Sequence, residues 1–231
     1  GSVLENVPAP ELVAGGSILP PTVVPYEVDI MREKGAEACT ADRKMILSIV
    51  DSLPEDKSSK ILVASPASKI MGAMLFKTTV MEDLRERGYD VMHITSKYGA
   101  YVNDQKVNRE QFFNIFDQYG KDPNKKFIIF HYSILSEGIN VHGLTHTIML
   151  RNLDIIEMAQ TIGRVIRMNK DDVADIANGK IAAGNVAMYR KSTGYVTVPV
   201  FKNYGAKTIK RLQRIVDTIF IEGQPATSLV V

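Results

Sequence analysis

The stretch Gln160-Thr161-Ile162-Gly163-Arg164-Val165-Ile166-Arg167 sets the expectations for the whole chain. If it is helical, Gln160, Arg164 and Arg167 lie on one face, because residues three and four apart are neighbours on a helix. Two guanidinium groups one turn apart can share the negative charge of a phosphoryl group during its transfer, as arginine fingers do in nucleotide hydrolysis. The alternative is the solvated basic edge of an ordinary helix, since charged faces usually contact only solvent.

The residues before this stretch favour the phosphate-contacting alternative. Apolar residues interleave with the polar ones from 155 to 168, so we expect a helix packed over most of its circumference with a narrow polar seam. Residues 127–131 and 145–150 are apolar runs that predict buried strands, and a polar segment containing a glycine separates them. The expected order is strand, polar loop, strand and arginine helix.

Two segments together resemble the second RecA-like domain of superfamily 2 helicases. Residues 136–140, Ser-Glu-Gly-Ile-Asn, resemble motif V of that family, and residues 160–167 resemble motif VI, Gln-x-x-Gly-Arg-x-x-Arg. The pair is more specific than either motif alone. The likeness is greatest to phage UvsW-like recombination helicases and extends to the helicase subunits of restriction enzymes. It covers residues 10–175 by pattern, although only the two motifs are specific.

The resemblance implies roles for the polar residues of the arginine helix. Arg164 and Arg167 would approach the γ-phosphate of an ATP that is held, together with Mg²⁺, mainly by another domain. Gln160 would help to couple that site to nucleic acid. These three residues are the candidate catalytic residues of the chain.

The resemblance also implies nucleotide contacts from three further residues. Gly138 would allow close approach of the backbone, Asn140 would contact the ribose, and Gly163 belongs to the same nucleotide site. Many relatives carry Asp where this chain has Asn140, so the ribose contact would be a neutral hydrogen bond. The alternative is that Gly138 and Asn140 are ordinary turn residues.

Strands alternate with helices along the chain. Residues 60–64, 89–95 and 127–131 predict strands. Helices are expected at 41–53, from after residue 69 to about 87, and from a capping box at Asn108 onwards. This alternation predicts an α/β fold with a parallel sheet and helices on both faces. The resemblance makes it RecA-like, of the P-loop NTPase type, with a small C-terminal hairpin and helix as an extension.

Polar residues follow three of the predicted strands. Ligands of parallel sheets gather at the carboxyl ends of strands, and small hydroxyl groups and lysines suit contact with a single-stranded phosphate backbone. The alternative is that they are helix caps and turn residues. The candidate nucleic-acid contacts are Ser65, Ser68, Lys69, Thr95, Ser96 and Ser133.

The chain lacks the Gly-x-x-x-x-Gly-Lys-Ser/Thr loop that a self-sufficient ATPase of this kind needs. We therefore expect the second half of a motor, cut from a longer protein and inactive by itself. Residues 1–40 are interpreted as a linker from a missing N-terminal motor domain, with an edge strand expected near residues 23–30. Residues 41–175 are interpreted as the helicase C-terminal RecA-like domain. Residues 176–231 are expected to form an extension, with a hairpin of strands 185–190 and 195–201 followed by a basic amphipathic helix.

Composition limits the other possibilities. Lys and Arg number 28 against 26 Asp and Glu, so a nucleic-acid footprint has to be local. A single cysteine excludes internal disulfides, and the spacing of His142 and His146 fits turn residues better than a metal pair, so no metal site is expected. No apolar run predicts a membrane span or a signal peptide, and a cytoplasmic protein of a bacterial or phage-infected cell is expected.

The leading hypothesis is the C-terminal motor domain of an ATP-dependent DNA helicase or translocase, with DNA favoured over RNA. Its partners would be nucleic acid and the N-terminal RecA-like domain of the same protein. Two alternatives stay open: a non-catalytic, helicase-derived nucleic-acid-binding module, and the motor part of a restriction-enzyme helicase subunit. The basic helix face of Lys207, Lys210, Arg211 and Arg214 either contacts nucleic acid or faces solvent.

Overall fold

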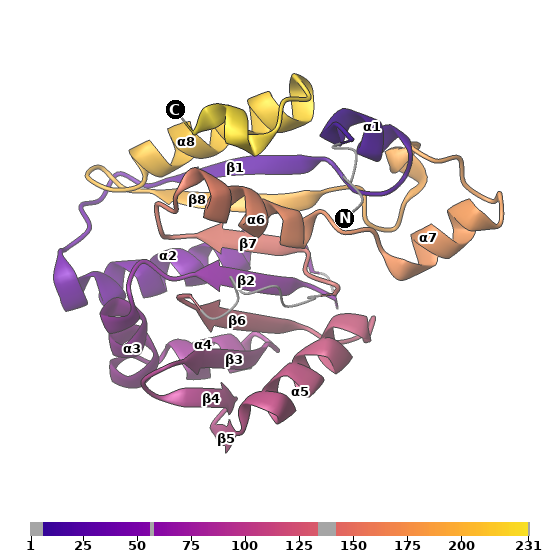
Figure 1. Cartoon of the computed structure of the whole chain (residues 1–231). Helices are drawn as coiled ribbons and strands as arrows, with labels where there is room; N and C mark the ends of the chain where they lie inside the picture. The colour runs from indigo at the N-terminus through magenta and orange to yellow at the C-terminus, as the bar shows by residue number, and fades with distance from the viewer. Residues whose placement is uncertain (1–6, 56–57, 134–141, 231) are drawn as a thin grey trace.

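A computed structural model describes residues 7–55, 58–133 and 142–230 (Figure 1). Eight strands form one sheet in the order β1-β8-β7-β2-β6-β3-β4-β5. The pairs from β1 to β3 are all parallel, and the last two pairs are antiparallel. The strands are β1 (Pro21–Glu27), β2 (Lys60–Ala64), β3 (Asp90–Thr95), β4 (Gly99–Val102), β5 (Gln105–Val107), β6 (Phe127–His131), β7 (His146–Met149) and β8 (Gly194–Val200).

Helices cover both faces of this sheet. On one face, α2 (Ala38–Ser52), α3 (Ser68–Lys77) and α4 (Val80–Glu86) enclose a core with Ile61, Val63 and Ile128. On the other face, α5 (Arg109–Lys121), α6 (Ile155–Val165) and α8 (Ala206–Val216) pack on Leu62 and Ile129. The predicted α/β fold with a mainly parallel sheet is therefore confirmed.

Shorter helices complete the described chain. They are α1 (Ala9–Ala14), α7 (Lys170–Ala177), η1 (Gly35–Glu37), η3 (Val186–Met188), η4 (Asp217–Ile221) and η5 (Ala226–Leu229). Within the described residues, no helix has the length and apolar character that crossing a bilayer requires.

Local sequence signals explain where several elements begin and end. The side chain of Asn108 accepts a hydrogen bond from Gln111 N at 2.8 Å, and Gln111 Oε1 accepts one from Asn108 N at 3.1 Å. This reciprocal capping box opens α5 as predicted. Gly88 has φ +82° directly after α4 and so allows the chain to turn into β3.

The prediction of one long helix up to residue 87 is wrong, because the structure has two helices there, α3 and α4. Thr78 lies between them in an extended conformation, and its hydroxyl group donates to the Met74 carbonyl oxygen. Thr79 Oγ1 then donates to Asp83 Oδ2 at 3.0 Å in the first turn of α4. Two β-branched residues with hydroxyl groups that bind locally favour such a break over a continuous helix.

The expected C-terminal hairpin is also wrong. Residues 186–188 form the 3₁₀ helix η3, and β8 lies inside the sheet, where it pairs in parallel with both β1 and β7. Val196 and Val198 of β8 are completely buried, so burial in the main core outweighs the local turn signal at residues 192–194. Strands from all three predicted segments thus share one sheet, while the boundaries at residues 40 and 175 stay predictions.

The edge strand expected near residues 23–30 exists as β1. It contains Pro21 and Pro25, which an edge strand tolerates because one side of its backbone has no ladder to join. β1 pairs with β8, so the segment interpreted as a linker contributes a strand to the sheet.

A buried ion pair fixes the segment between β1 and α2. Arg32 Nε and Nη2 donate to the two carboxylate oxygens of Asp42, both at 2.6 Å, and the two side chains are 6% and 0% exposed. The guanidinium group lies 4.0 Å from the centre of the Tyr204 ring. The side-chain amide of Asn203 accepts from Arg32 N and donates to Arg32 O, each at 2.8 Å. This cluster joins α2 to the chain that follows β8.

Candidate functional site

Helix α6 carries the polar seam that the sequence predicts. Asp154 caps its first turn by accepting from Glu157 N at 2.8 Å. Met158, Ile162 and Val165 are buried on the inner face of the helix. The polar seam beside this face carries Glu157, Gln160, Thr161 and Arg164. The hydroxyl group of the buried Thr161 donates to the Glu157 carbonyl oxygen at 2.8 Å.

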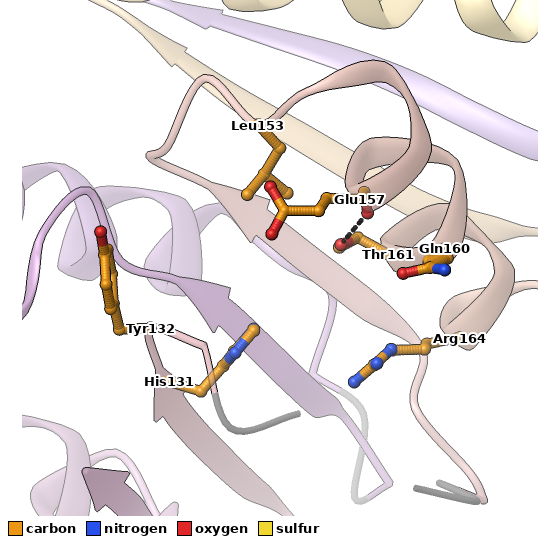
Figure 2. Close-up of a pocket in the computed structure, with 7 residues that line it drawn as sticks. All are labelled: His131, Tyr132, Leu153, Glu157, Gln160, Thr161 and Arg164. Atoms are coloured by element: carbon orange, nitrogen blue, oxygen red, sulfur yellow. Dashed lines mark hydrogen bonds between the residues drawn. The ribbon is translucent and has the colours of Figure 1, made fainter. Parts of the chain in front are cut away.

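A small cavity lies between this seam and the end of β6 (Figure 2). Its volume is about 20 Å³, which is room for about one water molecule. A cavity of this size is too small to enclose a nucleotide. The cavity is lined by His131, Tyr132, Leu153, Glu157, Gln160, Thr161 and Arg164.

The cation of Arg164 has no counter-charge in the part of the chain that the structure describes. Its Nη1 atom is buried and has no hydrogen-bond partner there, and no described carboxylate forms an ion pair with it. Figure 2 shows the side chain extending from α6 toward the ring of His131. Burial lowers the pKa of Arg164, and the charge of Arg167 lowers it further. A half-buried cation with an unpartnered donor atom is a ready contact for an anion.

Arg167 does not continue the helical face, which corrects the expected arrangement. Helix α6 ends at Val165, and Arg167 forms an antiparallel bridge with Ile18. The Arg167 carbonyl oxygen accepts from Lys191 Nζ at 2.9 Å, and Lys191 Nζ also donates to Leu144 O at 2.7 Å. These tertiary contacts hold the backbone of Arg167 outside the helix. The charge of Arg167 nevertheless lies close enough to lower the pKa of Arg164.

His131 and Arg151 belong to the same cavity region but were not singled out in the sequence as site residues. Neither ring nitrogen of His131 has a hydrogen-bond partner among the described residues. Burial, followed by the charges of Arg164 and Arg151, lowers the pKa of His131 to about 3. Arg151 Nη1 donates to Tyr132 O at 3.0 Å, and its guanidinium group lies 4.2 Å from the Tyr132 ring centre. An arginine directly after a buried parallel strand is the signal that could have identified Arg151.

The candidate nucleic-acid residues divide into accessible and buried groups. The carboxyl ends of β2, β3 and β6 lie at one edge, because these strands are parallel neighbours. Ser65 is completely buried there, and Thr95 is 8% exposed with its hydroxyl oxygen accepting from Tyr98 N at 2.8 Å. Thr95 therefore stabilises a turn. The exposed candidates are Ser68, Lys69, Ser96 and Ser133.

Comparison with protein families identifies the chain. The family described as "Helicase conserved C-terminal domain" matches residues 43–169, which include β2, β3, β6, β7 and α6. The chain belongs to this family. No curated protein gives a significant match to the chain.

Solved structures that are similar to this chain include the following three, of which one reaches a TM-score above 0.5. "ATP-dependent Type ISP restriction-modification enzyme LlaBIII bound to DNA" matches with a TM-score of 0.53 and 13% identity, over 92% of this chain and 15% of that one. "The crystal structure of T4 UvsW" matches with a TM-score of 0.49 and 14% identity, over 88% and 40%. "Mss116p DEAD-box helicase domain 2 bound to an RNA duplex" has a TM-score of 0.38 and 12% identity, over 79% and 54%. The chain thus spans between 15% and 54% of these proteins.

Only one of the two motif glycines lies in the part of the chain that the structure describes. Gly138 and Asn140 lie outside the described residues. Gly163 lies within α6, and a Cβ atom placed on it would have no atom within 4 Å. Nothing in the described structure therefore requires a glycine at this position, which leaves its nucleotide role as a prediction.

We expect Gly163→Ala to raise the free energy of unfolding of the domain by about 0.5–1 kcal/mol, because alanine favours a helix interior more than glycine does. Urea unfolding of the two proteins measures this. If Gly163 also allows a nucleotide to approach closely, the same variant will lose ATPase activity in the assembled motor. If Gly163→Ala instead lowers the free energy of unfolding of the isolated domain, α6 has a close neighbour at this position.

His131 is expected to make the domain sensitive to acid. Its folded-state pKa of about 3 lies below the ordinary value of 6.5, so the unfolded chain takes up the proton first as the pH falls. The resulting loss in the free energy of unfolding is small above pH 6.5 and grows to about 2 kcal/mol at pH 5. His93, with a pKa lowered to about 4 by burial, adds a similar loss.

The test compares urea unfolding of the wild type and His131→Leu at pH 7.5 and pH 5. We expect the variant to lose less stability on acidification, because one of the two buried histidines is gone. His142→Gln, at an exposed position, is the matched control and should keep the wild-type loss. Equal losses in His131→Leu and the wild type would contradict the burial of a neutral His131.

Proposed function

We propose that this domain is the C-terminal motor domain of an ATP-dependent superfamily 2 DNA helicase or translocase. The observation that carries the proposal is the half-buried Arg164 side chain of α6, whose Nη1 atom is buried and has no hydrogen-bond partner among the described residues. It belongs to a Gln-x-x-Gly-Arg-x-x-Arg sequence in a chain of the helicase C-terminal family. A buried donor atom without a partner is costly to the fold, and a role in binding an anion would explain its presence.

The residues present fit a phosphate group that approaches from outside the domain. Arg164 offers a buried donor, and the charge of Arg167 lies near it. Gln160 lines the same cavity, from which it could couple the site to nucleic acid. Within the described residues, no three His, Cys, Asp or Glu side chains gather as metal ligands, so Mg²⁺ would be held by the other domain.

ATP and Mg²⁺ would therefore be held mainly by an N-terminal RecA-like domain, and Gly138, Asn140 and Gly163 would add contacts from this side. Bound Mg²⁺ would supply positive charge to the phosphates. This chain would contribute guanidinium groups whose positions are set by α6 and by the contact of Lys191 with the Arg167 carbonyl group. Groups fixed in a poorly solvated site stabilise developing charge more than mobile groups in water do.

The edge formed by the carboxyl ends of β2, β3 and β6 would contact the nucleic acid. Ser68, Lys69, Ser96 and Ser133 are exposed there. Their hydroxyl and ammonium groups suit a phosphate backbone and do not discriminate between bases. Ser65 and Thr95 would support this edge from inside, because both are buried.

The test of this function is ATPase activity measured on this chain alone and on the chain joined to its N-terminal RecA-like domain, with and without single-stranded DNA. We expect no turnover above background from the chain alone and DNA-stimulated turnover from the joined protein. Full turnover from this chain would contradict the division of the site between two domains. DNA binding by the joined protein without ATP hydrolysis would instead favour the non-catalytic binding module.

A further inference from the structure

A second pocket lies where the first turn of α6, helix α8 and η5 meet, away from the cavity around His131 and Arg164. Helix α8 lies along β1 and β8 (Figure 1), and η5 packs against α6. The pocket has a volume of about 290 Å³, close to the lower end of the range for ligand-binding pockets. It is lined by Ile155, Lys210, Arg211, Arg214, Ile215 and Leu229.

The pocket combines an apolar floor with a cationic rim. Ile155, Ile215 and Leu229 supply the apolar side chains, one from each of the three elements. The other three lining residues are Lys210, Arg211 and Arg214. Large apolar side chains beside several cations bind best to a ligand that offers both chemistries.

The cations of the rim are available for a ligand. None of the three forms an ion pair with a carboxylate in the described parts of the chain. Arg211 Nη1 donates to Leu153 O at 2.6 Å, which fixes the direction of that side chain but leaves its charge uncompensated. Asp217, the first acidic residue after them in sequence, accepts a hydrogen bond from Gln213 at 2.8 Å.

The positive charge is local to this part of the molecule. The chain as a whole has a net charge of +2, while residues 202–216 contain five basic residues and no acidic residue. Lys210 and Arg214 are exposed and lie one turn apart on α8. A ligand with two or three negative charges could therefore contact the rim without meeting a carboxylate of α8.

We infer that this pocket binds an acidic peptide segment of a partner protein, with a large apolar side chain of the peptide on the floor and flanking carboxylates on the rim. A nucleic-acid backbone would satisfy the cations but would leave the apolar floor without a complement. An apolar peptide would leave three cations partly desolvated and unpaired, which costs free energy. An acidic peptide with an apolar residue complements both parts. This inference does not depend on the proposed motor function.

Selection from a library of random peptides about twelve residues long, displayed on phage, tests the inference on this chain. We expect the selected peptides to carry Asp or Glu next to Leu, Ile or Phe. Binding of a fluorescent copy of the best peptide is then measured by anisotropy. The double variant Lys210→Glu/Arg214→Glu should raise its Kd at least about tenfold, because two attractions become repulsions. Leu229→Ser should also raise the Kd, by removing part of the floor.

Lys207→Glu is the matched control, because Lys207 is an exposed lysine of the same helix that does not line the pocket. Its Kd should stay within about threefold of the wild-type value. Circular dichroism and urea unfolding check that all variants are folded. Selected peptides without acidic residues, or a Kd that Lys210→Glu/Arg214→Glu leaves unchanged, would overturn the inference. A third outcome would also overturn it: the double variant weakens binding of a single-stranded oligonucleotide but of no selected peptide. The surface would then bind nucleic acid.

Discussion

Arg164→Met, in the protein joined to its ATP-holding domain, is expected to lower kcat for ATP hydrolysis by about 10³-fold or more. The affinity for ATP should change little, because the other domain would hold most of the nucleotide. The physical reason is that a guanidinium group at the γ-phosphate stabilises charge that develops during the transfer. Steady-state ATPase assays and binding of a fluorescent ATP analogue separate the two effects.

The same substitution should not harm the fold. Arg164 Nη1 is buried without a hydrogen-bond partner among the described residues, so the folded state carries a desolvation cost there. Methionine has a similar length and no charge. We expect the free energy of unfolding of the chain to stay the same or to rise by up to about 1 kcal/mol in Arg164→Met. A residue kept at a cost to stability, and needed for turnover, is the signature of a functional group.

Arg109→Met is the matched control for Arg164→Met. Arg109 begins α5 on the surface, and its guanidinium group lies over the Phe113 ring at 5.3 Å. We expect normal turnover from this variant. Normal turnover from Arg164→Met as well would refute the arginine-finger assignment, whereas a large loss of stability in Arg164→Met would show that Arg164 is a structural residue.

Asp42→Ala is expected to destabilise the chain by about 3–5 kcal/mol. Arg32 would keep its burial and its contact with the Tyr204 ring, but it would lose both charge-assisted hydrogen bonds. An uncompensated cation in a buried position is among the most costly results of a single substitution. Urea unfolding followed by circular dichroism measures the change.

Two comparisons make this result specific. Asp51→Ala breaks the pair of Asp51 with Arg87, in which the side chains are 55% and 31% exposed, so it should cost less than about 1 kcal/mol. Arg32→Met/Asp42→Leu removes both charges of the buried pair and should cost much less than Asp42→Ala alone. A loss below about 1 kcal/mol for Asp42→Ala would mean that water reaches Arg32 and replaces the carboxylate.

The parts of the fold that the sequence predicted depend on local patterns. The apolar run 127–131 forms β6, the capping box at Asn108 opens α5, and Gly88 turns the chain after α4. In each case the residues that carry the signal are within a few positions of the structure they determine. The short strands β4 and β5 were not predicted, because their seven residues contain little regular alternation and only Ala100 and Val102 are buried.

The candidate site was predicted in part for the same reason. Gln160 and Arg164 lie on one seam of α6, as helical spacing requires. Arg167 leaves the helix because Ile18 and Lys191, both far away in sequence, bind its backbone. His131 enters the site because the last residue of β6 faces α6, which depends on the order of strands in the sheet.

By itself, the sequence determined the alternation of strands and helices, the family to which the chain belongs and the helix that places Arg164 beside Gln160. These follow from periodicity, capping and a short motif, all of which act through neighbouring residues. Only the tertiary structure decided that β1 and β8 complete the sheet, that the Nη1 atom of Arg164 is buried in the cavity that His131 also lines, and that three cations of α8 line a pocket with apolar side chains. Those features arise from contacts between segments far apart in the chain, and pairing and burial between such segments are not encoded in any local pattern.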